Sequence, residues 1–118
     1  MKPRDVAILA AQTIDGKKGE DIRIVDVRKV SPITDFVVIA SATSMPHLRG
    51  LRAEVAKVLR EKASEDIRRE AGDPESAWLV MDYFNVIIHL FLPEARAYYD
   101  IEMLWEKGRN VNTWRTGE

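Results

Sequence analysis

Apolar residues recur along the chain with two periods, one typical of helices and the other typical of strands. A spacing of three and four residues predicts helices over residues 3–15 and from Ser44 to residues 63–66. Ser44 suits the N-cap of the second helix because its hydroxyl can accept a hydrogen bond from an amide of the first turn. Pro93 opens a third helical pattern, which continues to about Glu106.

Runs rich in β-branched residues predict the strands. The expected strands are residues 21–27, 35–41, 78–82 and 86–92, with a weakly signalled edge strand at 66–70. The run at 35–41 is apolar on both faces, which is typical of a central strand. The short connection Tyr83-Phe84-Asn85 predicts an antiparallel hairpin between the last two strands, and Gly72-Asp73-Pro74 predicts a turn.

This order, α-β-β-α-(β)-β-β-α, predicts an α/β (α+β) fold with a single mixed β-sheet and helices mainly on one face. The other face of the sheet then stays partly free, and a free face has to be polar or bind something. The 118 residues suit one domain, which we expect over residues 1–107. The polar residues 108–118 are expected to form a flexible C-terminal tail.

Charge and cysteine content exclude several classes of function. With 18 Lys and Arg against 19 Asp and Glu, the net charge of −1 excludes strong non-specific affinity for nucleic-acid phosphates, and we expect no direct sequence-specific nucleic-acid binding. The absence of cysteine excludes disulfides and thiolate metal sites. His47 and His89 fall on different elements, so we expect no metal and no cofactor. No run of about 18 apolar residues occurs, which predicts a cytoplasmic protein without a membrane span.

Two alternative functions depend on charged side chains. A Mg-dependent nucleotidyltransferase-like enzyme would need Asp26, Asp35 or Asp82 to converge on the ion, but their spacing does not indicate convergence, and capping or pairing with arginines explains them better. An RNA-binding module would use a set of arginines and would bind more weakly as salt rises. These arginines are Arg49, Arg52, Arg60, Arg68 and Arg69.

Aromatic residues concentrate in the last third of the chain and indicate an interaction surface. Seven of the nine Phe, Trp and Tyr residues lie between Trp78 and Trp105. Aromatic side chains dominate both cores and binding hot spots, and we expect Phe91 and Trp105 to pack in the core. Trp78 shares a strand face with Asp82, which favours a surface anchor. His89 faces the same side as Phe91 and is either a hydrogen-bonded structural residue or a partner contact.

Three segments occur together in an informative order. The first is Val30-Ser31-Pro32-Ile33-Thr34-Asp35-Phe36-Val37-Val38-Ile39-Ala40 followed by Thr43-Ser44, the second runs from Trp78 to Phe91, and the third runs from Pro93 to Trp105. With these segments, residues 3–106 resemble the ribosomal silencing factor family, also called RsfS or Iojap. The chain departs from the family pattern at positions that concern local turn shape, which are Ala42, Ala71 and Phe84-Asn85.

The resemblance implies a fold like that of nucleotidyltransferases without their catalytic residues, and therefore no enzymatic activity. It implies binding to the large ribosomal subunit through large-subunit ribosomal protein fourteen, which sterically blocks joining of the small subunit and represses translation. Some members of the family form homodimers, so a second copy of the chain is another candidate partner. Carried over by position, the candidate partner-binding residues are Trp78, Asp82, Tyr83, His89, Arg96, Tyr98, Tyr99 and Glu102.

Overall fold

The computed structural model describes residues 1–115, without the side chains of residues 73, 74 and 115. Its α-helices are α1 (Pro3–Gly16), α2 (Met45–Ala63) and α3 (Pro93–Tyr99). Its strands are β1 (Glu20–Asp26), β2 (Phe36–Ser41), β3 (Arg69–Asp73), β4 (Trp78–Asp82), β5 (Val86–Phe91) and β6 (Arg109–Asn110). Short 3-10 helices follow β3, α3 and β6; they are η1 (Pro74–Ser76), η2 (Ile101–Trp105) and η3 (Thr113–Arg115).

All strands of the described chain form one sheet in the order β3-β4-β5-β2-β1-β6. The central pair β2 and β5 is parallel, and the other neighbouring pairs are antiparallel. This arrangement confirms the predicted mixed sheet and the predicted β4–β5 hairpin. A parallel pair needs a long crossover connection, and α2 together with β3 and β4 supplies it.

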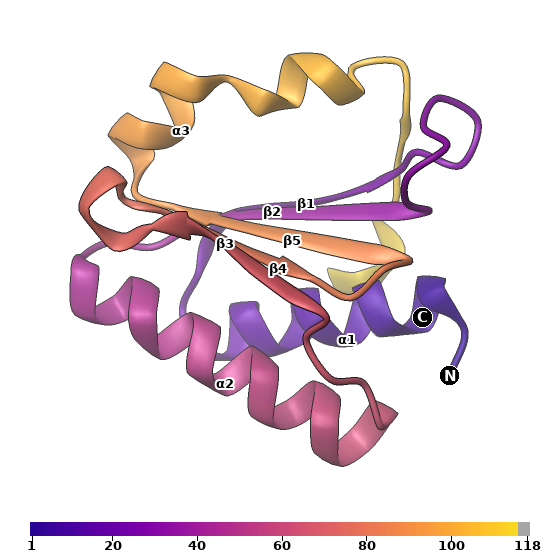
Figure 1. The fold of residues 1–118 in the computed structure, drawn as a ribbon, viewed down its shortest axis with the longest axis horizontal. Helices are drawn as coiled ribbons and strands as arrows, with labels where there is room; N and C mark the ends of the chain where they lie inside the picture. Colours follow the sequence, from indigo (N-terminus) through magenta and orange to yellow (C-terminus); the bar gives the residue numbers. More distant parts are fainter. Residues whose placement is uncertain (116–118) are drawn as a thin grey trace.

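The larger core lies between the sheet and the long helices α1 and α2, which both cover the lower face in Figure 1. Strand β2 is buried along its full length, as its apolar residues on both faces predict. Helix α2 begins at the predicted cap, where the Ser44 hydroxyl accepts a hydrogen bond from the His47 amide at 3.1 Å. The buried stripe of α2 repeats at helical spacing and consists of Leu48, Leu51, Val55 and Leu59.

Helix α3 and η2 cover part of the opposite face, which the sequence pattern leaves free (Figure 1). Ala95 and Ile101 pack there with Val37, Ile39 and Phe91 in a second, smaller core. The burial of Phe91 agrees with its expected core position. The two long helices therefore share one face, as predicted, while the short α3–η2 segment bridges the other.

The single helix predicted over residues 93–106 is divided into α3 and η2 by Asp100. Asp100 has a left-handed backbone with a φ of 47°, and its amide donates a hydrogen bond to the Arg96 carbonyl. This turn brings Glu102 back to Arg96, where the guanidinium donates two hydrogen bonds of 3.1 Å to the carboxylate. The long-range partners of these two side chains, rather than helical spacing, decide where α3 ends.

The predicted edge strand forms three residues later than expected, so Gly72 and Asp73 belong to β3 and not to a turn. Gly72 has a φ of 91°, and a Cβ atom there would lie 2.9 Å from the Leu79 Cα. Glycine allows this close approach of the β3 and β4 backbones.

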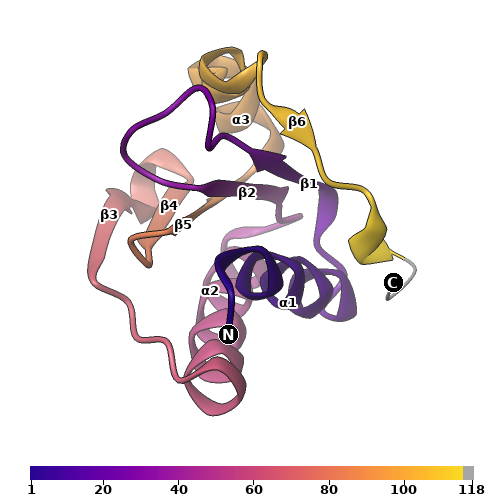
Figure 2. The same cartoon turned by 90° about the vertical axis from the view of Figure 1, so that its right-hand side faces the viewer.

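The segment after residue 107 packs onto the domain as far as the structure describes it, contrary to the flexible tail expected over 108–118. Its backbone pairs with β1, and the Val111 amide donates to the Ile24 carbonyl at 2.9 Å. Trp114 is 3% exposed, and the Gln12 amide of α1 donates to its carbonyl at 3.3 Å. Figure 2 shows β6 and η3 running beside β1 and α1. Residues 116–118 lie outside the described part of the chain.

Candidate protein-binding surface

An aromatic cluster lies where β4 and β5 run beneath α3. Its centre is Trp78, whose ring centroid lies 4.7 Å from that of Tyr99, 5.3 Å from that of Phe91 and 5.9 Å from that of His89. Trp78 and Phe91 are cross-strand partners, so the register of the sheet brings them together. Tyr98 packs edge-on against Tyr99, with ring centroids 5.1 Å apart. The cluster therefore ties α3 to the sheet and orients the two tyrosines.

His89 has a structural role within this cluster. The Trp78 indole Nε1–H donates a hydrogen bond to His89 Nδ1 at 3.2 Å. Burial lowers the pKa of His89 from 6.5 to about 4, because the apolar surroundings penalise the charged imidazolium. The ring is therefore neutral near pH 7, with Nδ1 as the acceptor. Of the two roles expected for this residue, the structure supports the hydrogen-bonded one.

An ion-pair network holds the α3–η2 segment at its middle. The Arg96 guanidinium bonds to Glu102 and donates to the Ser41 hydroxyl of β2 at 2.9 Å. Arg23 of β1 donates to the same Glu102 carboxylate at 2.6 Å and to Asn110 at 2.8 Å. Arg96, and then Arg23, hold the pKa of the Glu102 carboxyl below its usual value. Arg96 and Glu102 are thus engaged within the chain.

The outer side of this segment exposes apolar side chains, which we call the α3–η2 surface. It comprises Tyr98, Tyr99, Met103 and Leu104, exposed to 81%, 39%, 65% and 69%. Large apolar side chains gathered in this way are typical of a binding site. A partner that covered Tyr98 and Tyr99 would bury aromatic area that the cluster beneath already holds in place, and Met103 and Leu104 would add aliphatic area from η2.

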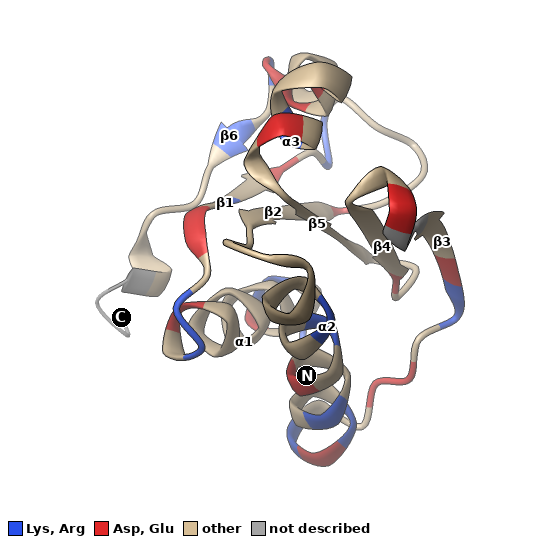
Figure 3. Cartoon of the chain, turned by 90° about the vertical axis from the view of Figure 1, so that its left-hand side faces the viewer, with Lys and Arg blue, Asp and Glu red and all other residues tan. Residues whose placement is uncertain are grey.

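A hollow of about 730 Å³ adjoins the two tyrosines, between α3 and the turn that joins β3 to β4. Glu75 and Glu94 line it together with Tyr98 and Tyr99. Figure 3 shows the acidic positions on α3 and on the facing η1 turn. The surface therefore combines aromatic anchors with negative charge, which suits a partner carrying Lys or Arg beside apolar residues.

The remaining predicted site residues, Asp82 and Tyr83, lie at the far end of β4. Asp82 accepts a hydrogen bond from the Phe84 amide at 2.8 Å and so shapes the β4–β5 turn. Tyr83 is 3% exposed and packs in the core on the side of α1 and α2. Burial raises the pKa of its hydroxyl to about 12. A buried side chain cannot reach a partner, so we withdraw Tyr83 from the predicted contact set.

Met103 and Leu104 were absent from the predicted contact set, although the sequence holds a signal for them. They lie two and three residues after the buried Ile101 and are adjacent to each other. Two consecutive apolar residues on a tight helical turn cannot both face the sheet, so at least one has to point outward.

Two of the three aspartates of the enzyme hypothesis, Asp26 and Asp82, bond to different partners, and the Asp35 carboxylate forms no hydrogen bond or ion pair within residues 1–115. Asp26 bonds to Arg28 through both carboxylate oxygens, at 3.0 and 2.7 Å, and Asp82 bonds to the turn. Over residues 1–115, no group of three or more His, Asp or Glu side chains is placed to hold a metal ion. In the same part of the chain, no helix is long and apolar enough to cross a membrane.

Four of the five arginines of the RNA-binding hypothesis line one groove beside α2, and Arg49 is not among its lining residues. Most of the charge in this groove is compensated. Arg52 pairs with Glu70, and Arg60 pairs with Asp66 at 2.9 Å. Arg68 lies over the Phe84 ring, 5.2 Å from its centroid. Arg69 lies 4.0 Å from Asp82. Lys57 and Arg68 are the lining cations without a carboxylate partner in the described chain, so part of the positive charge of the groove remains.

Residues 1–116 match the family model described as "Ribosomal silencing factor during starvation". A ribosomal silencing factor RsfS from Halalkalibacterium halodurans is 31% identical over 105 residues, which cover 89% of each chain. The mouse protein named "Mitochondrial assembly of ribosomal large subunit protein 1" is 33% identical over 92 residues, covering 75% of this chain and 40% of that protein.

Solved structures agree with the fold. The crystal structure of a protein from Chromobacterium violaceum matches with a TM-score of 0.84 and 30% identity, over 95% of this chain and 92% of that one. A second crystal structure, of a protein from Bacillus halodurans, matches with a TM-score of 0.78 and 28% identity, over 92% and 98% of the two chains.

Proposed function

This chain belongs to the ribosomal silencing factor family, and from this premise we propose that it binds the large ribosomal subunit through large-subunit ribosomal protein fourteen. In the proposal, the bound protein sterically blocks the small subunit and so represses translation in the cytoplasm. The name of the mouse relative, which refers to assembly of the large subunit, supports the large subunit as the partner. A mechanism by occupancy needs no catalytic group.

The observation that carries the proposal is the α3–η2 surface. Tyr98 is 81% exposed although it is a large aromatic residue, and the ring of Tyr99 beside it packs at a tilt against Trp78. Side chains that are already oriented lose little conformational entropy on binding. Trp78 is half-buried, so it acts as the platform beneath Tyr99, and Tyr98 makes the main contact.

Charge favours a ribosomal protein as the direct contact. Glu94 lines the hollow beside Tyr98 and forms no ion pair within the described chain. Ribosomal proteins are rich in Lys and Arg, and complementary charge raises the rate and specificity of docking. A standard interface of about 1,600 Å² would extend beyond the hollow onto Met103 and Leu104.

Co-sedimentation with purified large subunits tests the contact, and light scattering of mixed subunits tests the block. We expect the wild-type protein to reduce subunit association and Tyr98→Ala to bind large subunits roughly tenfold more weakly, as for a hot-spot residue. Phe84→Ala is the matched control, because Phe84 is an exposed aromatic residue at the other end of β4. Undiminished subunit association at saturating protein would overturn the proposed block.

A second copy of the chain is the alternative occupant of the same surface. Size-exclusion chromatography with light scattering distinguishes the two cases. We expect a second copy to compete with the subunit, so Tyr98→Ala would then lower both the dimer fraction and large-subunit binding. Loss of the dimer alone, with full subunit binding, would assign the surface to self-association instead.

A further inference from the structure

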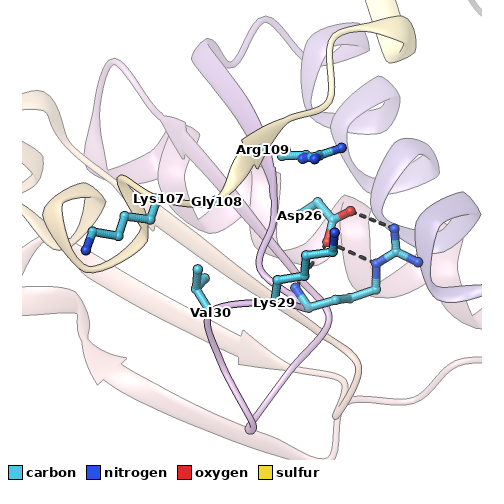
Figure 4. Close-up of a pocket in the computed structure, with 7 residues that line it drawn as sticks. Asp26, Lys29, Val30, Lys107, Gly108 and Arg109 are labelled. Atoms are coloured by element: carbon cyan, nitrogen blue, oxygen red, sulfur yellow. Dashed lines mark hydrogen bonds and ion pairs between the residues drawn. The ribbon is translucent and has the colours of Figure 1, made fainter.

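A second hollow lies past the C-terminal end of η2, away from the tyrosines. Its volume is about 440 Å³, and two segments line it. Asp26, Arg28 and Lys29 come from the end of β1 and the loop after it, while Lys107, Gly108 and Arg109 come from the segment that leads into β6. Figure 4 shows these side chains as sticks. We call this hollow the basic pocket.

The basic pocket carries uncompensated positive charge. Asp26 is the only carboxylate that lines it, and Arg28 occupies that carboxylate with its amide, Nε and Nη2 groups at 3.1, 3.0 and 2.7 Å. Within residues 1–115, Lys29, Lys107 and Arg109 form no ion pair or side-chain hydrogen bond. Lys29 and Lys107 therefore remain as exposed cations without a partner in the described chain. Arg109, whose charge acts on Asp26 after that of Arg28, is a third exposed cation at the pocket, in a chain whose net charge is −1.

The backbone holds the two walls of the pocket together. Arg109 pairs with Asp26 in the β1–β6 ladder, and the Gly108 amide donates to the Trp105 carbonyl at 2.9 Å. A Cβ atom at Gly108 would lie 2.5 Å from Val25 Cγ1 and 2.9 Å from the Asp26 carbonyl oxygen. Glycine thus permits the close approach that places Lys107 and Arg109 opposite the β1 loop.

The groove beside α2 is a useful comparison, because it also gathers arginines. There Glu70 and Asp66 pair with two of the cations, and Phe84 covers a third. An ion pair leaves little charge for a ligand. The basic pocket differs in number, because three of its four cations have no ion pair within residues 1–115, whereas Lys57 and Arg68 are the cations left without one in the groove.

We infer that the basic pocket binds backbone phosphates of RNA. This inference rests on the proposed function, since the RNA is then ribosomal RNA exposed next to the protein contact on the large subunit. Phosphate groups recur along a nucleic-acid strand, and several flexible cations spread around an open hollow suit such a row better than a single small anion. The near-neutral net charge explains why the contact would add to a protein-mediated interface and would not drive binding alone.

Salt dependence of large-subunit binding tests the inference. The test variant is Lys29→Gln, Lys107→Gln and Arg109→Gln combined. We expect its plot of log affinity against log salt to be less steep than that of the wild type by about 2, because each lost phosphate contact removes about 0.7–0.9 from the slope. The matched control removes the same charge from the exposed face of α2, as Arg49→Gln, Lys57→Gln and Lys62→Gln combined, and should keep the wild-type slope.

The outcomes separate this inference from the proposed function. If the wild-type protein does not bind large subunits, the proposed function fails. If it binds and the two triple variants keep the same slope, the RNA contact is wrong while the proposed function stands. Lys107→Glu alone, at an exposed residue outside any strand, gives a second measure that does not disturb β6, and we expect it to weaken binding several-fold.

A labelled oligouridylate and a polyglutamate of equal charge identify the kind of anion. At low salt we expect the wild-type protein and the α2 control to bind the oligouridylate weakly, and the pocket variant to lose this binding. Stronger binding of polyglutamate than of oligouridylate would overturn RNA as the ligand and point to an acidic protein.

Discussion

Acid should destabilise this protein through His89, and the size of the effect follows from its environment. The pKa of His89 is about 4 in the folded state, against an ordinary value of 6.5. Between these two pH values the imidazole is therefore protonated in the unfolded chain and neutral in the folded chain. The contribution of His89 to the free energy of unfolding is therefore fully present above about pH 6.5 and is lost as the pH falls toward 4. Between about pH 7 and pH 5 this linkage costs about 2 kcal/mol.

Urea unfolding at the two pH values measures this loss. His89→Gln provides the key comparison, because an amide oxygen can still accept the Trp78 indole N–H but does not titrate. We expect the wild-type protein to lose about 2 kcal/mol on acidification and His89→Gln to lose little. His47→Gln is the matched control and should retain the wild-type loss, since His89 is still present. An equal loss in the wild-type protein and in His89→Gln would refute the reasoning.

Three further substitutions test the contacts that hold the α3–η2 segment and the C-terminal segment in place. Glu102→Gln should lower the unfolding free energy by about 1–3 kcal/mol near pH 7, because it leaves Arg96 without its charged partner; in urea titrations the deficit should shrink as the pH falls through the lowered pKa of Glu102. Gly108→Ala should cost about 1–3 kcal/mol, because its Cβ would overlap Val25; an unchanged melting temperature would contradict this. Trp114→Ala should lower the free energy of unfolding by about 3 kcal/mol and speed hydrogen exchange at the Val111 amide. Unchanged protection of that amide would contradict the prediction.

Much of the fold was predictable because its signals are local. The hairpin of β4 and β5 follows from a short connection between two apolar runs, and the cap of α2 follows from Ser44. Strand β6 could not be predicted in the same way. It has two residues, both exposed, and exists because their backbones bond to β1. Backbone pairing of this kind leaves no hydrophobic pattern in the sequence.

Six of the eight candidate residues lie together around α3 and η2, but the role of each could not be predicted from the sequence. A resemblance carries residue types from position to position and does not say which side chains are buried. Tyr83 illustrates this, although alternation along the strand offered a warning: it follows Asp82 and therefore faces away from the side of Trp78. The engagement of Arg96 with Glu102 depends on the left-handed turn at Asp100, which helical spacing does not reveal.

The short pairing of β6 with β1 also limits aggregation between copies of this chain. An open strand edge offers unpaired amides and carbonyls to any other extended chain, and such edges lead to aggregation. At the β1 edge, residues 109–111 occupy part of the row of backbone groups. At the opposite edge, β3 carries the exposed charges of Arg69 and Glu70, which discourage a neighbour by a different means. A chain shortened before residue 109 would keep its long helices and most of its sheet, yet it would lose solubility through the bared side of β1.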